Sequence, residues 1–181
     1  HLAAKQLIDQ EKRLFLPKVE ALLEKTNALG AVHRRNRTFS AAGLASLTNV
    51  RSEAYLGSFR PDVLATPVGL SEICVEIAVT HYVDDNKLTR VRQAGIPLME
   101  IDLAGYRSFT WDFLREALLT DRAPRKWLYH PEVEAAIASW EESLKPILAA
   151  IQKEADEAKA RQREAEKAWL AEEERALEEQ E

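Results

Sequence analysis

The stretch from residue 50 to residue 103 constrains the fold more than any other part of the chain. It contains three extended segments, 50–57, 58–67 and 73–81, which are rich in strand-forming residues and are separated by short turns at glycine and proline. Connections this short join antiparallel neighbours, so we expect the three segments to form a meander. A sheet therefore lies at the centre of the predicted fold.

A helical crossover and a further strand follow the meander. Residues 83–95 begin with the capping acid Asp84 and end at Gly95, as a short helix does. The apolar segment 96–103 is then typical of a strand. Because a helix separates it from the segment 73–81, we expect these two strands to lie parallel in one sheet.

Helices are predicted on both sides of this region in the sequence. The other predicted elements are an amphipathic helix over 1–12, a short extended piece over 13–17, a second helix over 17–26 that begins at Pro17, a helix over 108–120, a short extended or turn piece over 125–131, and a long Ala/Glu/Lys/Arg helical stretch over 132–181 interrupted early by Pro146. The predicted fold class is therefore α/β (α+β), with an α-β-β-β-α-β mixed sheet flanked by helices and a long C-terminal helical extension.

Charge divides the chain into two parts. The net charge is +3 over residues 1–130 and −8 over 131–181, so we expect a folded domain followed by a charged Ala/Glu-rich helical extension. The basic run HRRNR contains Arg34, Arg35 and Arg37. These arginines are candidates for binding nucleic acid, and a solvated surface loop is the alternative interpretation.

The extension carries apolar side chains on an otherwise polar helix. Because two tryptophans are costly to leave in water, this stripe is expected to pack on the domain, to pair with a second copy or with a partner protein, or else to stay solvated. The apolar positions are Trp140, Leu144, Ile147, Ile151, Trp169, Leu170 and Leu177.

Composition restricts the class of protein. The single cysteine, Cys74, cannot form an internal disulfide, and the sequence contains no Cys/His cluster with metal-ligand spacing. The apolar runs are too short to span a membrane. We therefore expect a cytoplasmic protein without a zinc site and without membrane contact.

A glutamate interrupts the most apolar predicted strand. Side chains alternate faces along a strand, so Glu76 points away from the face that carries Val75 and Ile77. Asp62 interrupts the preceding extended segment in the same way. If the two strands are neighbours, the two carboxylates converge and repel, so either one of them is protonated or a cation lies between them, and hard Mg²⁺ or Mn²⁺ is the obvious candidate. The alternative is structural, with Asp62 paired to Arg60 and Glu76 an ion-paired residue of an edge strand.

Several strings in the chain resemble one known family. They are RPDVLA, VEIAVTH followed by the VDDNK helix, GIPLMEIDL, the N-terminal HLAAK and RKWLYHP. On these strings the segment 50–103 resembles the nuclease-like domain of the competence protein CoiA-like family, a branch of the PD-(D/E)XK (restriction endonuclease-like) superfamily. The resemblance implies that residues 1–130 form a nuclease-like domain in which Asp62 and Glu76 bind the metal.

The chain departs from the motif at Ala78, which stands where the superfamily has a lysine that orients water and stabilises charge. A relocated cation could replace it, and the candidates are His81, Lys87 and Lys5. His81 could instead cap a helix.

Other residues are assigned to the site or to its support. Glu53 is a candidate third metal ligand or an exposed strand residue, and Thr80 and His1 are candidates for contacting nucleic acid. Glu100 and Asp102 could support the site from a buried position or could be exposed at a strand end.

Three functions follow as expectations, and the last of them is a protein-interaction subunit whose acidic tail docks a partner. The first is a metal-dependent deoxyribonuclease that acts in DNA uptake, DNA processing or defence against foreign DNA. The second is a catalytically inactive nucleic-acid-binding or assembly module that kept the fold after losing the lysine at Ala78.

Overall fold

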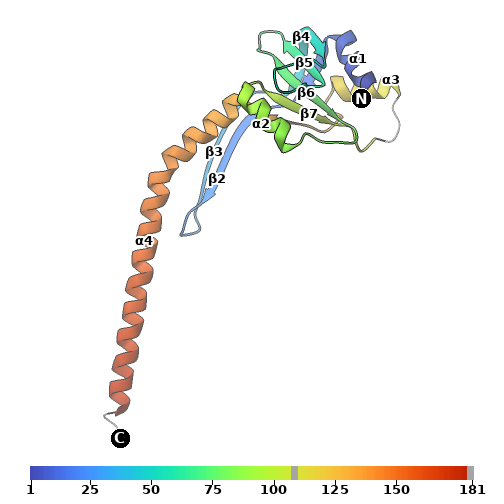
Figure 1. Ribbon diagram of the computed structural model, residues 1–181. Coiled ribbons are helices and arrows are strands. Elements are labelled where there is room, and N and C mark those ends of the chain that lie inside the picture. The colour runs from blue at the N-terminus through green and yellow to red at the C-terminus, as the bar shows by residue number, and fades with distance from the viewer. Residues whose placement is uncertain (107–109, 179–181) are drawn as a thin grey trace. The chain divides into compact units, whose positions relative to one another are not determined.

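The computed structural model describes residues 1–106 and 110–178, with side chains described as far as residue 175. Within these residues the chain forms a mixed α+β fold of four helices and eight strands, and the long C-terminal helix is present as predicted (Figure 1). In chain order the elements are α1 (Leu2–Glu11), β1 (Arg13–Leu16), β2 (Val19–Thr26), β3 (Val32–Ser40), β4 (Gly43–Ser52), β5 (Val63–Pro67), β6 (Ile73–Ala78), α2 (Asp85–Ala94), β7 (Leu98–Asp102), α3 (Trp111–Leu119), β8 (Arg125–Tyr129) and α4 (Pro131–Glu178).

Six strands form one mixed sheet in the order β1-β4-β5-β6-β7-β8. The predicted meander is confirmed, because β4 pairs with β5 and β5 pairs with β6, both antiparallel. The predicted parallel pair is also confirmed, since β7 lies parallel to β6 with Glu100 opposite Glu76. Helix α2 makes the crossover and has the predicted ends: Asp84 caps its first turn, and Gly95 takes a left-handed conformation after its last.

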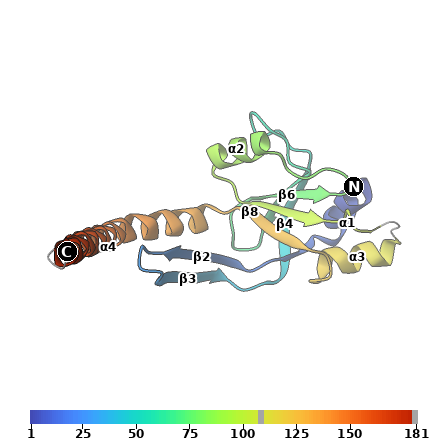
Figure 2. The same ribbon diagram turned by 90° about the horizontal axis from the view of Figure 1, so that it is seen from below.

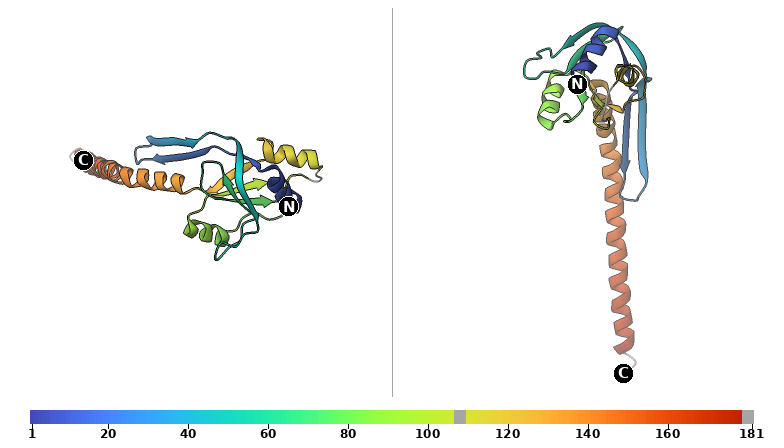
Figure 3. Two further views of the ribbon diagram at one scale, coloured as in Figure 1. Left: turned by 90° about the horizontal axis from the view of Figure 1, so that it is seen from above. Right: turned by 90° about the vertical axis from the view of Figure 1, so that its right-hand side faces the viewer.

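Helices cover both faces of this sheet, and β6 is buried along its whole length. The larger apolar core lies on the face of Val75, where Leu7 of α1 and Leu118 of α3 pack. On the other face, Cys74 packs with Val91 of α2. Figures 2 and 3 show α2 and α3 on opposite sides of the strands. The predicted alternation along β6 is thus confirmed, and α2 buries the face that carries Glu76.

The sheet curls so that side chains of its last strand reach the main chain of its first. Arg125 of β8 donates from Nη1 to Phe15 O of β1 at 2.7 Å. Trp127 donates from Nε1 to Pro17 O at 3.1 Å. Arg125 also donates from Nη2 to Thr120 O, at the C-terminal end of α3, at 2.7 Å. Side chains, rather than a strand ladder, therefore connect β8 to β1.

The predicted helix over 17–26 is wrong. Residues Val19–Thr26 form strand β2, which pairs with β3 in a separate two-stranded sheet. Burial along β2 has a period of two, because Val19, Ala21 and Leu23 are buried while the residues between them are exposed. The glutamates, leucines and lysine of this segment favour helix individually, but a weak propensity yields to the burial available in the folded chain.

The predicted interruption of the C-terminal helix at Pro146 is also wrong, because α4 continues through this residue. An internal proline removes one N–H donor and crowds the carbonyl four residues earlier, which bends a long helix without having to end it. Of the predicted apolar stripe, Leu144 is buried, whereas Ile147, Trp169 and Leu170 are exposed. Of the predicted elements, residues 108, 109 and 179–181 lie outside the described backbone, and Leu177 belongs to residues 176–178, whose side chains are not described.

The chain divides into two compact units. One comprises His1–Ala21 and Asn36–Ala136, and the other comprises Leu22–Arg35 and Ile137–Glu181. The six-stranded sheet belongs to the first unit. In the second unit, Lys25 Nζ of β2 lies 2.9 Å from Glu141 Oε1 of α4. Within the described part of the chain, no helix combines the length and the apolar character needed to cross a membrane.

Candidate functional site

Two carboxylates meet where β5 and β6 pair. Asp62 directly precedes β5, and Glu76 lies in β6, an inner strand of the sheet. Asp62 N donates to Glu76 Oε1 at 3.2 Å, and Ile77 N donates to Asp62 Oδ2 at 2.9 Å. The two acids that the sequence singles out are therefore neighbours in space, and each accepts a main-chain hydrogen bond from the other strand.

Helix α1 brings a lysine, and its N-cap a histidine, to Asp62. His1 and Lys5 are four residues apart and share a helix face, as predicted. His1 Nε2 lies 2.8 Å from Asp62 Oδ1, and Lys5 Nζ lies 3.8 Å from the same oxygen. The buried Lys5 ammonium contacts Glu53 Oε1 more closely, at 2.6 Å. Arg60, expected beside Asp62 in the structural interpretation, instead lies 3.5 Å from Glu53 Oε2.

The lysine side chain Lys87 reaches Glu76 from α2. Lys87 Nζ donates to Glu76 Oε2 at 2.7 Å, while the Lys87 main-chain N–H donates to Asp84 Oδ1 at 2.7 Å. Ala78 is buried two residues after Glu76 on the same strand. Lys87 therefore places beside Glu76 the positive charge that Ala78 lacks. The structural interpretation of Glu76 is wrong about an edge strand and right about an ion pair.

These groups surround a cavity of about 450 Å³ at the end of β6. The predicted site residues that line it are His1, Asp62, Glu76, Thr80, His81 and Lys87. Lys5 and Glu53 lie beside Asp62 through the contacts given above. The helix-cap alternative for His81 is wrong, because Asp84 caps α2. The cavity thus gathers carboxylates, an ammonium group and two imidazoles in a volume suited to a small polar group.

Burial raises the pKa of the Glu76 carboxyl above its ordinary value, and the hydrogen bond from Lys87 opposes that shift. The pKa of Glu53 is lowered, chiefly by its hydrogen bond with Lys5. The site therefore holds one desolvated acid and one acid stabilised in its charged form. Glu76 is a perturbed carboxyl that faces the cavity with a specific charge partner, which is characteristic of functional sites, whereas the exposed Glu53 does not line the cavity.

Glu100 and Asp102 on β7 support this region. Glu100 is 2% exposed, so the expectation that it lies in solvent is wrong. Its Oε2 accepts a hydrogen bond from Val83 N at 2.9 Å, and its Oε1 lies 3.4 Å from Lys126 Nζ. Asp102 is half-buried and accepts a hydrogen bond from Tyr82 OH at 3.1 Å. Sequence reasoning did not single out Tyr82 or Val83, and only the in-register pairing of β6 with β7 identifies their role.

The three arginines of HRRNR lie on β3 rather than in a loop. Arg34 Nη2 lies 2.6 Å from Glu24 Oε2 on β2, and the Arg37 guanidinium lies 4.7 Å from the centre of the Phe39 ring. All three arginines are exposed, and none of them lines the cavity. They form part of an exposed basic strand.

The carboxylates fit a hard divalent cation by their chemistry. Mg²⁺ and Mn²⁺ are commonly held by one or two carboxylates, with water completing the coordination. Asp62 and Glu76 supply such a pair at one cavity, and each carboxylate oxygen has lone pairs beyond the one that accepts a hydrogen bond. Within residues 1–106 and 110–178, no group of three or more His, Cys, Asp or Glu side chains is placed to hold a metal. Water or substrate would therefore have to supply most of the ligands.

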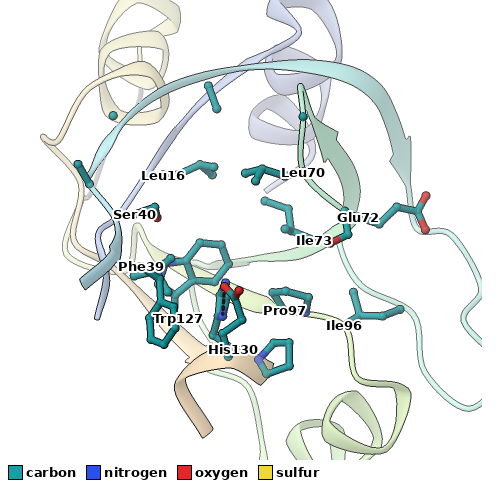
Figure 4. Close-up of a pocket in the computed structure, with 18 of the residues that line it drawn as sticks. Leu16, Phe39, Ser40, Leu70, Glu72, Ile73, Ile96, Pro97, Trp127 and His130 are labelled. Atoms are coloured by element: carbon teal, nitrogen blue, oxygen red, sulfur yellow. Dashed lines mark ion pairs between the residues drawn. The ribbon is translucent and has the colours of Figure 1, made fainter. Parts of the chain in front are cut away.

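A larger cavity, of about 980 Å³, lies where β6 and β7 begin, at the opposite end of these strands (Figure 4). Its walls are mostly apolar and include Leu16, Ile73, Pro97 and Trp127. His130 also lines it, but its Nδ1 is inaccessible and has no hydrogen-bond partner among the described residues. Size alone would favour this cavity, whereas the convergence of charged groups favours the one at Asp62 and Glu76.

Comparison with known proteins adds no relative: no family model, no curated protein and no solved structure matches the chain.

Proposed function

We propose that the chain is a divalent-metal-dependent nuclease that hydrolyses phosphodiester bonds of DNA. The observation that carries this proposal is the pair Asp62 and Glu76 at one cavity, with the Lys87 ammonium 2.7 Å from Glu76. The order α1, β4-β5-β6, α2, β7 agrees with the α-β-β-β-α-β core of the restriction endonuclease-like superfamily, with β1 and the β2–β3 hairpin inserted after α1. The resemblance of the strings RPDVLA and VEIAVTH to the CoiA-like family supports the same assignment.

Each residue has a role in this proposal. Asp62 and Glu76 would hold Mg²⁺ or Mn²⁺, which supplies charge neutralisation at the phosphate and acidifies a bound water. Lys87 orients the Glu76 carboxyl and favours its charged form, and its ammonium can also donate to a phosphate oxygen. His81 lines the cavity and, as a neutral imidazole, can accept a proton from water. His1 and Lys5 orient Asp62 from α1.

Cleavage of single- and double-stranded DNA tests the proposal. The protein is incubated with each substrate and Mg²⁺ or Mn²⁺, beside the variants Asp62→Asn, Glu76→Gln and Lys87→Met. Each variant is expected to lose about 10²-fold or more in rate, the scale of losing one group that stabilises developing charge. Lys159→Met, on the exposed part of α4, is the matched control and should cleave like the unaltered protein. Cleavage that survives both carboxylate substitutions would refute the proposal.

A catalytically inactive nucleic-acid-binding module is the second candidate. The observation that favours it is that all four oxygens of Asp62 and Glu76 already have a hydrogen-bond or ion-pair partner within the chain. Such a module would bind DNA with an affinity that falls steeply as salt rises, because lysine and arginine contacts release counterions, and it would show no cleavage with any divalent ion. Binding without cleavage selects this function over the nuclease.

A further inference from the structure

Glu100 places a carboxyl group where an apolar side chain would be cheaper to bury. It is 2% exposed and lies opposite Glu76 on the neighbouring parallel strand. Burying a carboxylate costs free energy unless it is well paired, and a second carboxylate alongside adds repulsion. One Glu100 oxygen accepts the Val83 N–H at 2.9 Å, and the other lies 3.4 Å from the exposed Lys126. The contact with Val83 is therefore the closer of its two interactions.

Val83 is the last residue but one of the irregular segment 79–84, which leaves the sheet after β6 and lines the cavity before α2 begins. A second contact holds the same segment to β7, since Tyr82 OH donates to Asp102 Oδ2 at 3.1 Å. Two carboxylates of one strand thus anchor consecutive residues of this segment. It also carries Thr80 and His81 along the cavity wall.

A short series of contacts connects this anchor to Lys87. The residue after Val83 is Asp84, whose Oδ1 accepts the Lys87 main-chain N–H at 2.7 Å. Lys87 then donates from Nζ to Glu76 Oε2 at 2.7 Å. The N-cap Asp84 fixes the position of the first turn of α2. Because Val83 directly precedes Asp84, the position of Val83 sets where that turn begins and therefore where the Lys87 ammonium lies.

We infer that Glu100 is a positioning residue: its bond to Val83 N–H fixes the start of α2 and so places the Lys87 ammonium against Glu76. The inference rests on the proposed function only where it expects an effect on DNA cleavage. The geometric part, from Glu100 to Lys87, can be measured without any nuclease activity.

The test compares Glu100→Gln with Glu100→Leu, since both remove the charge and only glutamine keeps an oxygen for Val83 N–H. Two measurements report on the contacts from Glu100 to Lys87. Amide hydrogen exchange at Val83 follows the hydrogen bond between Glu100 and the Val83 N–H. Acetylation of Lys87 by acetic anhydride, compared with that of Lys159 in the same sample, follows the accessibility of the Lys87 ammonium. We expect both to rise about tenfold in Glu100→Leu, the factor of one lost hydrogen bond of ordinary strength, and to stay near the original values in Glu100→Gln. Lys126→Met, which removes the other partner of Glu100, should leave both unchanged.

Equal values in the leucine and glutamine variants, or a rise in Lys126→Met, would overturn the inference. If circular dichroism shows that Glu100→Leu does not fold, Tyr82→Phe removes the second anchor at an exposed position, and unchanged acetylation of Lys87 there counts against the inference. Where the unaltered protein cleaves DNA, Glu100→Leu should lower kcat with KM little changed, and glutamine should restore kcat. A protein that never cleaves refutes the proposed function and leaves the acetylation result to decide on the anchor.

Discussion

Replacing Arg125 by methionine should weaken the fold more than any single surface substitution, because its guanidinium joins three elements. It donates to Phe15 O of β1 and to Thr120 O at the end of α3, each at 2.7 Å, to Ala117 O within α3 at 2.5 Å, and to Ala123 O at 3.1 Å. Methionine keeps the apolar stem and removes every donor. At about 1.5 kcal/mol for each of the three bonds of 2.7 Å or less, the low end of the usual range because Arg125 is part-exposed, the free energy of unfolding should fall by about 4.5 kcal/mol.

Urea unfolding followed by tryptophan fluorescence measures this loss. Trp127→Phe removes one neutral hydrogen bond to Pro17 O and should cost about 1 kcal/mol. Arg92→Met is the matched control, since Arg92 makes an exposed pair with Glu134 at 2.9 Å and should cost less than about 1 kcal/mol. If Arg125→Met loses no more stability than Arg92→Met, the side chains of β8 do not hold the curled sheet to β1.

Three further predictions concern titratable groups. Burial raises the pKa of the Cys74 thiol to about 12, so a disulfide reagent at pH 8 should modify this cysteine only after urea unfolds the protein. Burial lowers the pKa of His130, so the unfolded chain binds more protons below about pH 6.5; stability should fall as the pH drops through that range, and His130→Phe should reduce the slope. The hydrogen bond with Lys5 lowers the pKa of Glu53, so Glu53 stabilises the fold above its unfolded-state pKa and this contribution is lost as the pH falls through its folded-state pKa. Acid unfolding of Glu53→Gln should lack that loss of stability. An acid transition identical to that of the unaltered protein would contradict the pairing of Glu53 with Lys5.

Local signals were enough to predict the part of the fold that positions the site. The capping acid Asp84, the left-handed Gly95 and the short turn before β6 are read from a few adjacent residues, and the structure confirms each. The predicted strand boundary at Gly57 is wrong, because β4 ends at Ser52 and residues 53–62 connect it to β5. The parallel placement of β7 follows from the helical crossover alone. Alternation along β6 then predicted correctly which way Glu76 points.

The rest depends on partners that are distant in sequence. The residues of β2 form a strand because β3 pairs with them, and no local signal outweighed their helical propensity. The choice of Lys87 over His81 as the cation beside Glu76 depends on how far α2 is rotated on the sheet, which the helical period does not fix. Glu100 resembles an exposed residue at a strand end until its burial between β6 and β8 is known.

The side chains of Asp62 and Glu76 accept main-chain hydrogen bonds where β5 and β6 pair, so these acids have a structural role besides any chemical one. Each completes the pairing of a strand end that would otherwise leave an amide unsatisfied, so selection for a stable fold is sufficient to retain both. Under the proposed function, a descendant that had lost the nuclease activity would still carry the aspartate and the glutamate. In such a lineage, we expect His81, which lines the cavity, to be substituted before Asp62 or Glu76 once the proposed activity is lost.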